Sequence, residues 1–271
     1  MNCQNVKNQI ISFMVAKAMA AKARGFVVGV SGGVDSGLVS TLASLTGMPT
    51  ILLQLPIHRK EGEISRRAND HCKRLSDLFP NVSCFSHDLS STFDAFCNTL
   101  LCDIAELTGA NLRSRLRMVS AYAFANQFQY IVLGTGNKVE DFGVGFFTKY
   151  GDGGVDISPI GDLLKSEVRE LASYLGVSPE IVNAIPTDEL WADTRSDETA
   201  IGASYDELEE AMKIYDEWEE RNQIHSADIS LDDFTSLLSD RQKEVMKIYA
   251  KRHNANQHKM KMPPICIVDK N

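Results

Sequence analysis

The chain has 271 residues, 44% of them hydrophobic and 24% charged, which is long enough for one large α/β domain or two small ones. Its formal net charge of -8 argues against the basic face that nucleic-acid-binding proteins usually carry. No apolar run approaches the roughly 20 residues needed to cross a bilayer, and the first residues do not resemble a signal peptide. We therefore expect a cytoplasmic protein with no nucleic-acid and no membrane partner.

Short apolar runs alternate with helical patterns through the first two-thirds of the chain. After a first helix over residues 10–23, strands are predicted at 26–30, 50–55, 82–87 and 130–133. Helices are predicted between or after them at 37–45, 61–79, 91–107 and 111–128. This alternation predicts an α/β fold with a parallel five-stranded sheet and helices on both faces.

The rest of the chain departs from that alternation. Residues 186–204 are rich in Asp, Thr and Ser and are expected to form a long loop or lid, whereas residues 203–257 are helical and strongly charged. No internal repeat or linker is evident, so we expect a single domain over residues 1–271 with a helical C-terminal part. Ligands of open parallel sheets bind at the carboxyl ends of the strands, and glycine-rich segments follow two of the predicted strands, at 29–36 and 134–136.

The first glycine-rich segment contains Ser31-Gly32-Gly33-Val34-Asp35-Ser36. A strand-to-helix turn of this kind offers unpaired N–H groups and a helix N-terminus, which favour an anion, and glycines allow a phosphate to approach the backbone. Asp35 would repel phosphate unless a cation lies between them, so the loop predicts Mg²⁺. The simpler alternative is a tight turn in which Ser31 or Asp35 only caps the helix.

This loop is neither a Walker loop nor G-x-G-x-x-G. It resembles the phosphate loop S-G-G-x-D-S of the N-type ATP pyrophosphatases, in which the loop holds the pyrophosphate portion of ATP while a substrate oxygen attacks the α-phosphorus. The resemblance implies an adenine nucleotide alpha-hydrolase-like, Rossmann-like form of the predicted fold.

The second signature follows the fourth predicted strand and reads GTGNKVE over residues 134–140, then GFFTKYGDGGVD over residues 145–156. It closely resembles the G-F-F-T-K-Y-G-D-G-G-x-D core of the ammonia-dependent NAD synthetase family. The resemblance extends from Gly29 to His258-Lys259. Further agreeing segments are 111–118, Lys165, 184–187, Asp197-Glu198, Gly202 and Tyr205.

The resemblance implies ATP-dependent amidation of deamido-NAD with ammonia to NAD, through an acyl-adenylate, with release of AMP and pyrophosphate. It places ATP contacts at Gly29, Val30, Ser31, Gly32, Gly33, Val34, Asp35, Ser36, Thr135, Lys165 and Thr187. It places Mg²⁺ at Asp35 and Glu140. It places the dinucleotide at Arg115, Lys149, Asp156, His258 and Lys259. Asp152, near the ammonia, and Lys165 would be catalytic, and a homodimer is implied.

Each of these residues also has a simpler reading. Lys165 opens a predicted helix over residues 164–175 and could be a surface lysine, and Arg115 lies on a basic helix face where charges are usually solvated. His258-Lys259 lies near a C-terminus, where disorder is common.

Two features depart from the family pattern. The commoner form has G-T-D-H-A-A-E where this chain has GTGNKVE, and the connection from Glu140 to Lys149 is one residue longer here. The extra residue puts the local geometry around Val144 in question, but not the order of the motifs.

Three rival functions stay open, and we do not expect this chain to obtain its nitrogen from glutamine. With its first strand near residue 26, the chain leaves no room for an N-terminal glutaminase, so we expect nitrogen from free ammonia or a separate partner. The rivals are the same chemistry on nicotinate mononucleotide, a tRNA-thiolating pyrophosphatase and a non-catalytic adenine-nucleotide sensor. The sequence lacks the paired cysteines of the second, and Asp35, Glu140 and Lys165 argue against the third.

Overall fold

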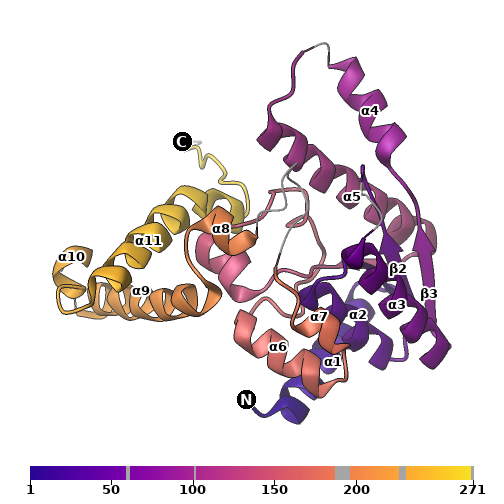
Figure 1. The fold of residues 1–271 in the computed structure, drawn as a ribbon, viewed down its shortest axis with the longest axis horizontal. Coiled ribbons are helices and arrows are strands. Elements are labelled where there is room, and N and C mark those ends of the chain that lie inside the picture. Colours follow the sequence, from indigo (N-terminus) through magenta and orange to yellow (C-terminus); the bar gives the residue numbers. More distant parts are fainter. Residues whose placement is uncertain (59–61, 101, 187–195, 226–229, 270–271) are drawn as a thin grey trace.

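The computed structural model describes residues 1–58, 62–100, 102–186, 196–225 and 230–269. At its centre is a parallel sheet in the order β3-β2-β1-β4 (Figure 1). The strands are β1 (Phe26–Gly29), β2 (Thr50–Gln54), β3 (Val82–Ser86) and β4 (Ile131–Leu133). All pairs are parallel, with Phe26 aligned to Thr50 in β2 and to Ile131 in β4. The predicted α/β fold is confirmed.

The prediction of five strands is wrong, because the described residues form a sheet of four strands. Beyond β4 the chain returns only as an isolated bridge between Leu133 and Ile157. The Gly134 amide donates to the Ile157 carbonyl at 2.8 Å, and the Asp156 amide donates to the Val132 carbonyl at 3.0 Å. β4 ends at Leu133, because the glycine-rich segment that follows is poorly suited to a strand.

Helices cover both faces of the sheet and form the C-terminal part (Figure 1). Their bounds are α1 (Cys3–Ala20), α2 (Val34–Leu45), α3 (Glu63–Leu78), α4 (Ser90–Thr99), α5 (Glu106–Phe128), the π-helix η1 (Lys138–Val144), α6 (Lys165–Tyr174), α7 (Pro179–Val182), α8 (Asp197–Ile201), α9 (Tyr205–His225), α10 (Leu231–Phe234) and α11 (Asp240–Met260). Within the part of the chain that is described, none of these helices has the length and apolar character to cross a membrane.

One predicted helix, over residues 91–107, is wrong in its extent. α4 ends at Thr99, before the predicted end of this helix. The next helix was predicted from residue 111, but α5 already begins at Glu106. Ala105 is extended, and the carboxylate of Glu106 lies in the first turn of α5, where it complements the helix dipole.

The alternation of side chains along the strands builds two cores. In β1, Phe26 and Val28 join the cluster formed with α1, α2, α3 and α6, whereas Val27 joins the cluster on the opposite face with Ala121 and Ala125 of α5. Successive strand residues point to opposite faces, so both faces of a buried strand must be apolar. The buried residues of β1 are therefore apolar, and polar site residues are expected in the segments that follow the carboxyl ends of the strands.

A third core joins η1 to α9 and α11 and contains Val139, Val144, Tyr205 and Tyr249. In Figure 1 these C-terminal helices lie beside the sheet and its covering helices, with α8 between the two parts. The predicted helical C-terminal part is confirmed. This arrangement brings the start of α9 next to the segment that follows β4.

Candidate active site

The loop after β1 is ordered by its own hydroxyl groups. Ser31 Oγ accepts from the Gly33 amide at 3.2 Å, and Ser36 Oγ donates to the Gly33 carbonyl at 3.0 Å. Gly32 has φ of +93°, and a Cβ there would press on the backbone oxygen of Ile64 in α3, so only glycine fits. α2 begins at Val34 directly after this turn, and the amides of its first turn have no partners within the helix. The loop is therefore suited to binding a phosphate.

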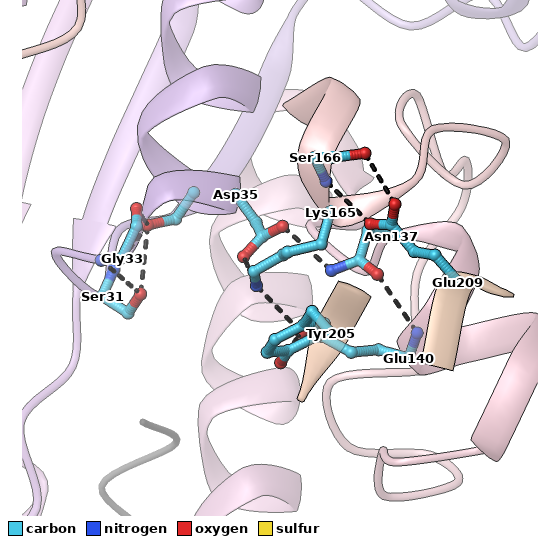
Figure 2. A network of polar contacts seen from close by, with 10 residues as sticks. Ser31, Gly33, Asp35, Asn137, Glu140, Lys165, Ser166, Tyr205 and Glu209 are labelled. Carbon is cyan, nitrogen blue, oxygen red and sulfur yellow. Dashed lines mark hydrogen bonds and ion pairs between the residues drawn. The ribbon is translucent and has the colours of Figure 1, made fainter. Parts of the chain in front are cut away.

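Lys165 joins this loop to the segment after β4. Its Nζ donates to Asp35 Oδ2 at 2.7 Å and to Glu140 Oε1 at 2.9 Å (Figure 2). Its side chain is only 3% exposed. The surface-lysine reading is therefore wrong. Asp35 is not the helix cap either, because the N-cap of α2 is Gly33. Three chain segments converge here through a single ammonium group.

Burial and mutual charge shift the pKa values of the groups in this cluster. Burial acts to lower the pKa of Lys165, but the charges of Asp35 and Glu140 outweigh it and raise that pKa above its ordinary value. Burial acts to raise the pKa of Glu140, but the charge of Lys165 and the hydrogen bond from Tyr205 hold it below its ordinary value. At Asp35 burial outweighs the charge of Lys165 and raises the pKa of that carboxyl group. The ammonium therefore lies between two carboxyl groups whose pKa values are shifted in opposite directions.

Asn137 and Tyr205 belong to the cluster and were not predicted as site residues. Asn137 is fully buried, donates from Nδ2 to Asp35 Oδ1 at 3.0 Å and accepts at Oδ1 from the Glu140 amide at 3.1 Å. The hydroxyl of Tyr205 donates to Glu140 Oε1 at 2.5 Å. The sequence signal for Asn137 was its place in GTGNK. Tyr205 was noted in the sequence only as a position that agrees with the family, without a role, because it approaches Glu140 only through the packing of α9.

Two departures from the commoner family pattern, the sequence GTGNKVE at residues 134–140 and the longer connection from Glu140 to Lys149, can be located in the structure. A Cβ on Gly136 would overlap the carboxylate of Asp141, so that carboxylate takes the space of a side chain at position 136. Residues 138–144 form a π-helix, which has more residues per turn than an α-helix and so can take up a longer connection. It ends at Gly145 with φ of +64°.

A second group of polar residues surrounds residues 145–154, the glycine-rich turn that follows η1. Asp152 Oδ1 accepts from Ser114 Oγ at 2.6 Å and from the Thr148 amide at 2.9 Å, which ties the turn to α5. Arg115, one residue later on α5, directs Nε and Nη2 to the Lys149 carbonyl, each at 3.4 Å, and is exposed.

Asp156 is exposed but has partners. Its Oδ2 accepts from the Val132 amide at 2.7 Å and its Oδ1 accepts from the Tyr122 hydroxyl at 3.1 Å. In this structure the carboxylate therefore secures the isolated bridge beside β4.

His258 and Lys259 lie in the last turn of α11, so the reading as a disordered C-terminus is wrong. Lys259 Nζ donates to the carbonyls of Gly145 at 2.7 Å and Phe147 at 2.9 Å. Lys149 Nζ donates to the His258 carbonyl. The end of α11 is thus fastened to the glycine-rich turn through its two predicted ligand residues.

Asp141 connects the two groups electrostatically. Burial, and then the charges of Glu140, Asp152 and Asp35, raise the pKa of Asp141 well above its ordinary value. Asp141 therefore feels the charge of carboxyl groups from both groups of residues. Thr135 is partly buried just beyond β4, whereas Thr187 and residues 187–195 of the predicted lid lie outside the described residues.

Comparisons of this chain with known proteins all lead to the same family. The model of the NAD synthase family matches residues 6–263. The NH(3)-dependent NAD(+) synthetase of Methanosarcina mazei is 35% identical over 98% of this chain and 98% of its own length. An NMN synthetase from Francisella tularensis has a TM-score of 0.80 and 27% identity, with both chains covered completely. An NH3-dependent NAD synthetase from Campylobacter jejuni has a TM-score of 0.76 and 25% identity, covering 98% of this chain and 100% of that one.

Proposed function

Because this chain belongs to the NAD synthase family, we propose that it uses ATP and ammonia to amidate deamido-NAD to NAD. The nicotinate carboxylate attacks the α-phosphorus of ATP, which releases pyrophosphate and leaves an acyl-adenylate. Ammonia then attacks the activated carbonyl, and NAD and AMP leave. The enzyme is a ligase that forms a C–N bond.

The observation that carries this proposal is the buried Lys165 held between Asp35 and Glu140, beside the N-terminus of α2. A pyrophosphate leaving group at the loop would be bound by the α2 amides and by Ser31 and Ser36. Lys165, already in the site and protonated, would stabilise the charge that develops on the phosphate oxygens as the α-phosphorus is attacked. Gly29, Val30, Thr135 and Thr187 complete the proposed ATP site.

Mg²⁺ is the proposed metal, and the site fits it. Asp35 and Glu140 offer hard oxygen ligands and already accommodate one cationic group between them. Mg²⁺ is usually bound through one or two carboxylates and takes its other ligands from water and substrate phosphates. When bound, the ion would neutralise phosphate charge.

The second group of residues would bind the dinucleotide and ammonia. The exposed Arg115 and the partly buried Lys149 match an anionic pyrophosphate and carboxylate, and Asp156, His258 and Lys259 complete this proposed set. Asp152 is anchored through Oδ1 by two donors. A carboxylate held in this way can accept hydrogen bonds from ammonium and take up its proton before attack.

Product analysis tests the proposal. Purified protein mixed with deamido-NAD, Mg-ATP and ammonium should form NAD, AMP and pyrophosphate in equal amounts. Formation of ADP and phosphate would contradict it. Turnover with glutamine as the sole nitrogen source would contradict the expectation of free ammonia as the donor.

A second candidate substrate is nicotinate mononucleotide, because the NMN synthetase from Francisella tularensis matches the fold over both full chains. The chemistry at the carboxylate would be the same. Parallel kinetics with both substrates decide between them: we expect the larger kcat/KM for deamido-NAD, and the reverse ratio would assign the mononucleotide.

We also propose a homodimer. Large apolar side chains on α4 and α5 are exposed, with Phe96 48%, Val119 57% and Phe128 42% exposed, whereas Ala121 and Ala125 of α5 are buried in the core. α5 thus has an apolar surface in addition to its buried face, which supports an interface between copies. Sedimentation equilibrium should give twice the mass of the chain, and a Val119→Glu variant should shift the protein toward monomer. The cytoplasmic location stays a prediction.

A further inference from the structure

The first residue of α9 reaches into the Lys165 cluster. Tyr205 is 1% exposed, its hydroxyl donates to Glu140 Oε1 at 2.5 Å, and its ring centre lies 4.7 Å from Lys165 Nζ. One side chain therefore contacts both the ammonium and one of the two carboxylates that hold it. Figure 2 shows the phenol ring beside the lysine.

One turn later, the same helix fastens the residue next to Lys165. Glu209 Oε1 accepts from the Ser166 amide at 2.8 Å, and its Oε2 accepts from Ser166 Oγ at 2.7 Å (Figure 2). Residues four apart lie on the same face of a helix, so Tyr205 and Glu209 act from one face of α9. Ser166 is in the first turn of α6, where a carboxylate also complements the helix dipole.

A lysine has particular need of such support. Its ammonium ends a flexible four-carbon stem with three rotatable donors, and ordering that stem costs conformational entropy. Glu209 fixes the backbone at the start of α6, whereas Tyr205 limits where the ammonium can move and orients Glu140. Burial, and then the charge of Glu140, raise the pKa of Tyr205, so its hydroxyl stays a donor.

We propose that Tyr205 and Glu209 are positioning residues that hold Lys165 in place for the activation of ATP. The role of Lys165 in this inference rests on the proposed function. The start of α9 thereby makes the geometry of the ATP site depend on the C-terminal helices. Those helices share the core that contains Tyr205 and Tyr249, and the end of α11 carries two of the proposed dinucleotide ligands.

The chain offers a matched control for the test. Tyr205→Phe keeps the ring and removes only the hydroxyl. Tyr249→Phe removes a hydroxyl from the same core, at a residue that is 0% exposed and whose hydroxyl has no hydrogen-bond partner among the described residues. Glu209→Gln keeps the size of the side chain and removes its charge.

Steady-state kinetics are measured for these variants with deamido-NAD, Mg-ATP and ammonium. For Tyr205→Phe we expect kcat to fall about 10- to 100-fold, the range for one hydrogen bond to a charged group, with little change in the KM for ATP. A displaced Lys165 weakens an interaction made in the transition state, so kcat and kcat/KM fall together. Glu209→Gln should show a smaller fall of the same kind, and Tyr249→Phe none.

A second measurement follows Lys165 directly, without turnover. Brief labelling with acetic anhydride, read by peptide mass spectrometry, should modify Lys165 faster in Tyr205→Phe than in the wild type or Tyr249→Phe. Equal kcat and equal labelling in Tyr205→Phe and Tyr249→Phe would overturn the inference, as would a rise in KM with kcat unchanged. Wild-type protein that forms no NAD and AMP would contradict the proposed function, and the labelling would then still decide whether α9 positions Lys165.

Discussion

Replacing Lys165 with methionine should create a site that binds divalent cations without nucleotide. Methionine keeps most of the length and apolar character of the side chain but leaves Asp35 and Glu140 facing each other without the ammonium that now lies 2.7 and 2.9 Å from them. Removing one partner of a buried ion pair costs about 3–5 kcal/mol. For a chain of this size that loss should lower Tm by on the order of 10 °C.

A divalent cation placed between the two carboxylates would offset much of that loss. In the wild type the ammonium of Lys165 already lies between them, so Mg²⁺ alone should change Tm little. In Lys165→Met, Mg²⁺ should raise Tm by several degrees, and Mn²⁺ titration followed by electron paramagnetic resonance should reveal one added site. Turnover should fall by about 100-fold or more, because a charge aimed at the transition state is lost.

The double variant Asp35→Asn with Lys165→Met is the control. It removes one of the two carboxylates and should lose the added metal response while keeping the apolar replacement. A metal response of equal size in the wild type and in Lys165→Met would refute the reasoning, because Lys165 would then not compete with the cation. Absence of any response in Lys165→Met would refute the metal assignment of Asp35 and Glu140.

Three further predictions concern residues around the site and in the core. Asn137→Ala removes the hydrogen bonds to Asp35 and to the Glu140 amide, so urea denaturation should show a loss of about 1.5–3 kcal/mol. Gly145→Ala meets a φ of +64° and the side chain of Asn256, and should lower Tm and expose α11 to proteolysis, at a cost of at least about 1–2 kcal/mol. Burial, and then the charge of Arg74, lower the pKa of His71 to about 4. The pKa of His71 in the folded state lies below its unfolded value, so burying the neutral imidazole costs nothing extra above about pH 6.5. As the pH falls toward 4, the free energy of unfolding should decrease by about 3 kcal/mol. The loss should be absent in His71→Gln, and equal acid sensitivity in that variant would contradict it.

The sequence predicted the features that depend on local pattern. Apolar runs gave the four strands because a strand buried on both faces must be apolar throughout. The loop after β1 was recognisable because glycine, hydroxyl and carboxylate groups lie within six residues, and the chemistry of a phosphate site acts over that distance. The two glycine-rich segments were expected at one edge of the sheet, whereas Lys165 was implied only by the family resemblance, and the structure brings it to Asp35.

The sequence did not predict the contacts made by packing between distant elements. Tyr205 is 65 residues from Glu140, and its role depends on how α9 packs against η1 and α6, which no local pattern encodes. Asn137 was taken only as a departure from the commoner motif, because its buried amide acts through Asp35, 102 residues away.

The central claim is that the nicotinate carboxylate attacks the α-phosphorus of ATP in the site built by Asp35, Glu140 and Lys165. Deamido-NAD labelled with ¹⁸O in that carboxylate tests it most directly, with ammonium and Mg-ATP present and the products analysed by mass spectrometry. Formation of an acyl-adenylate predicts that one ¹⁸O from each substrate molecule appears in AMP and none in pyrophosphate. Unlabelled AMP, or label in free phosphate together with ADP, would contradict the account.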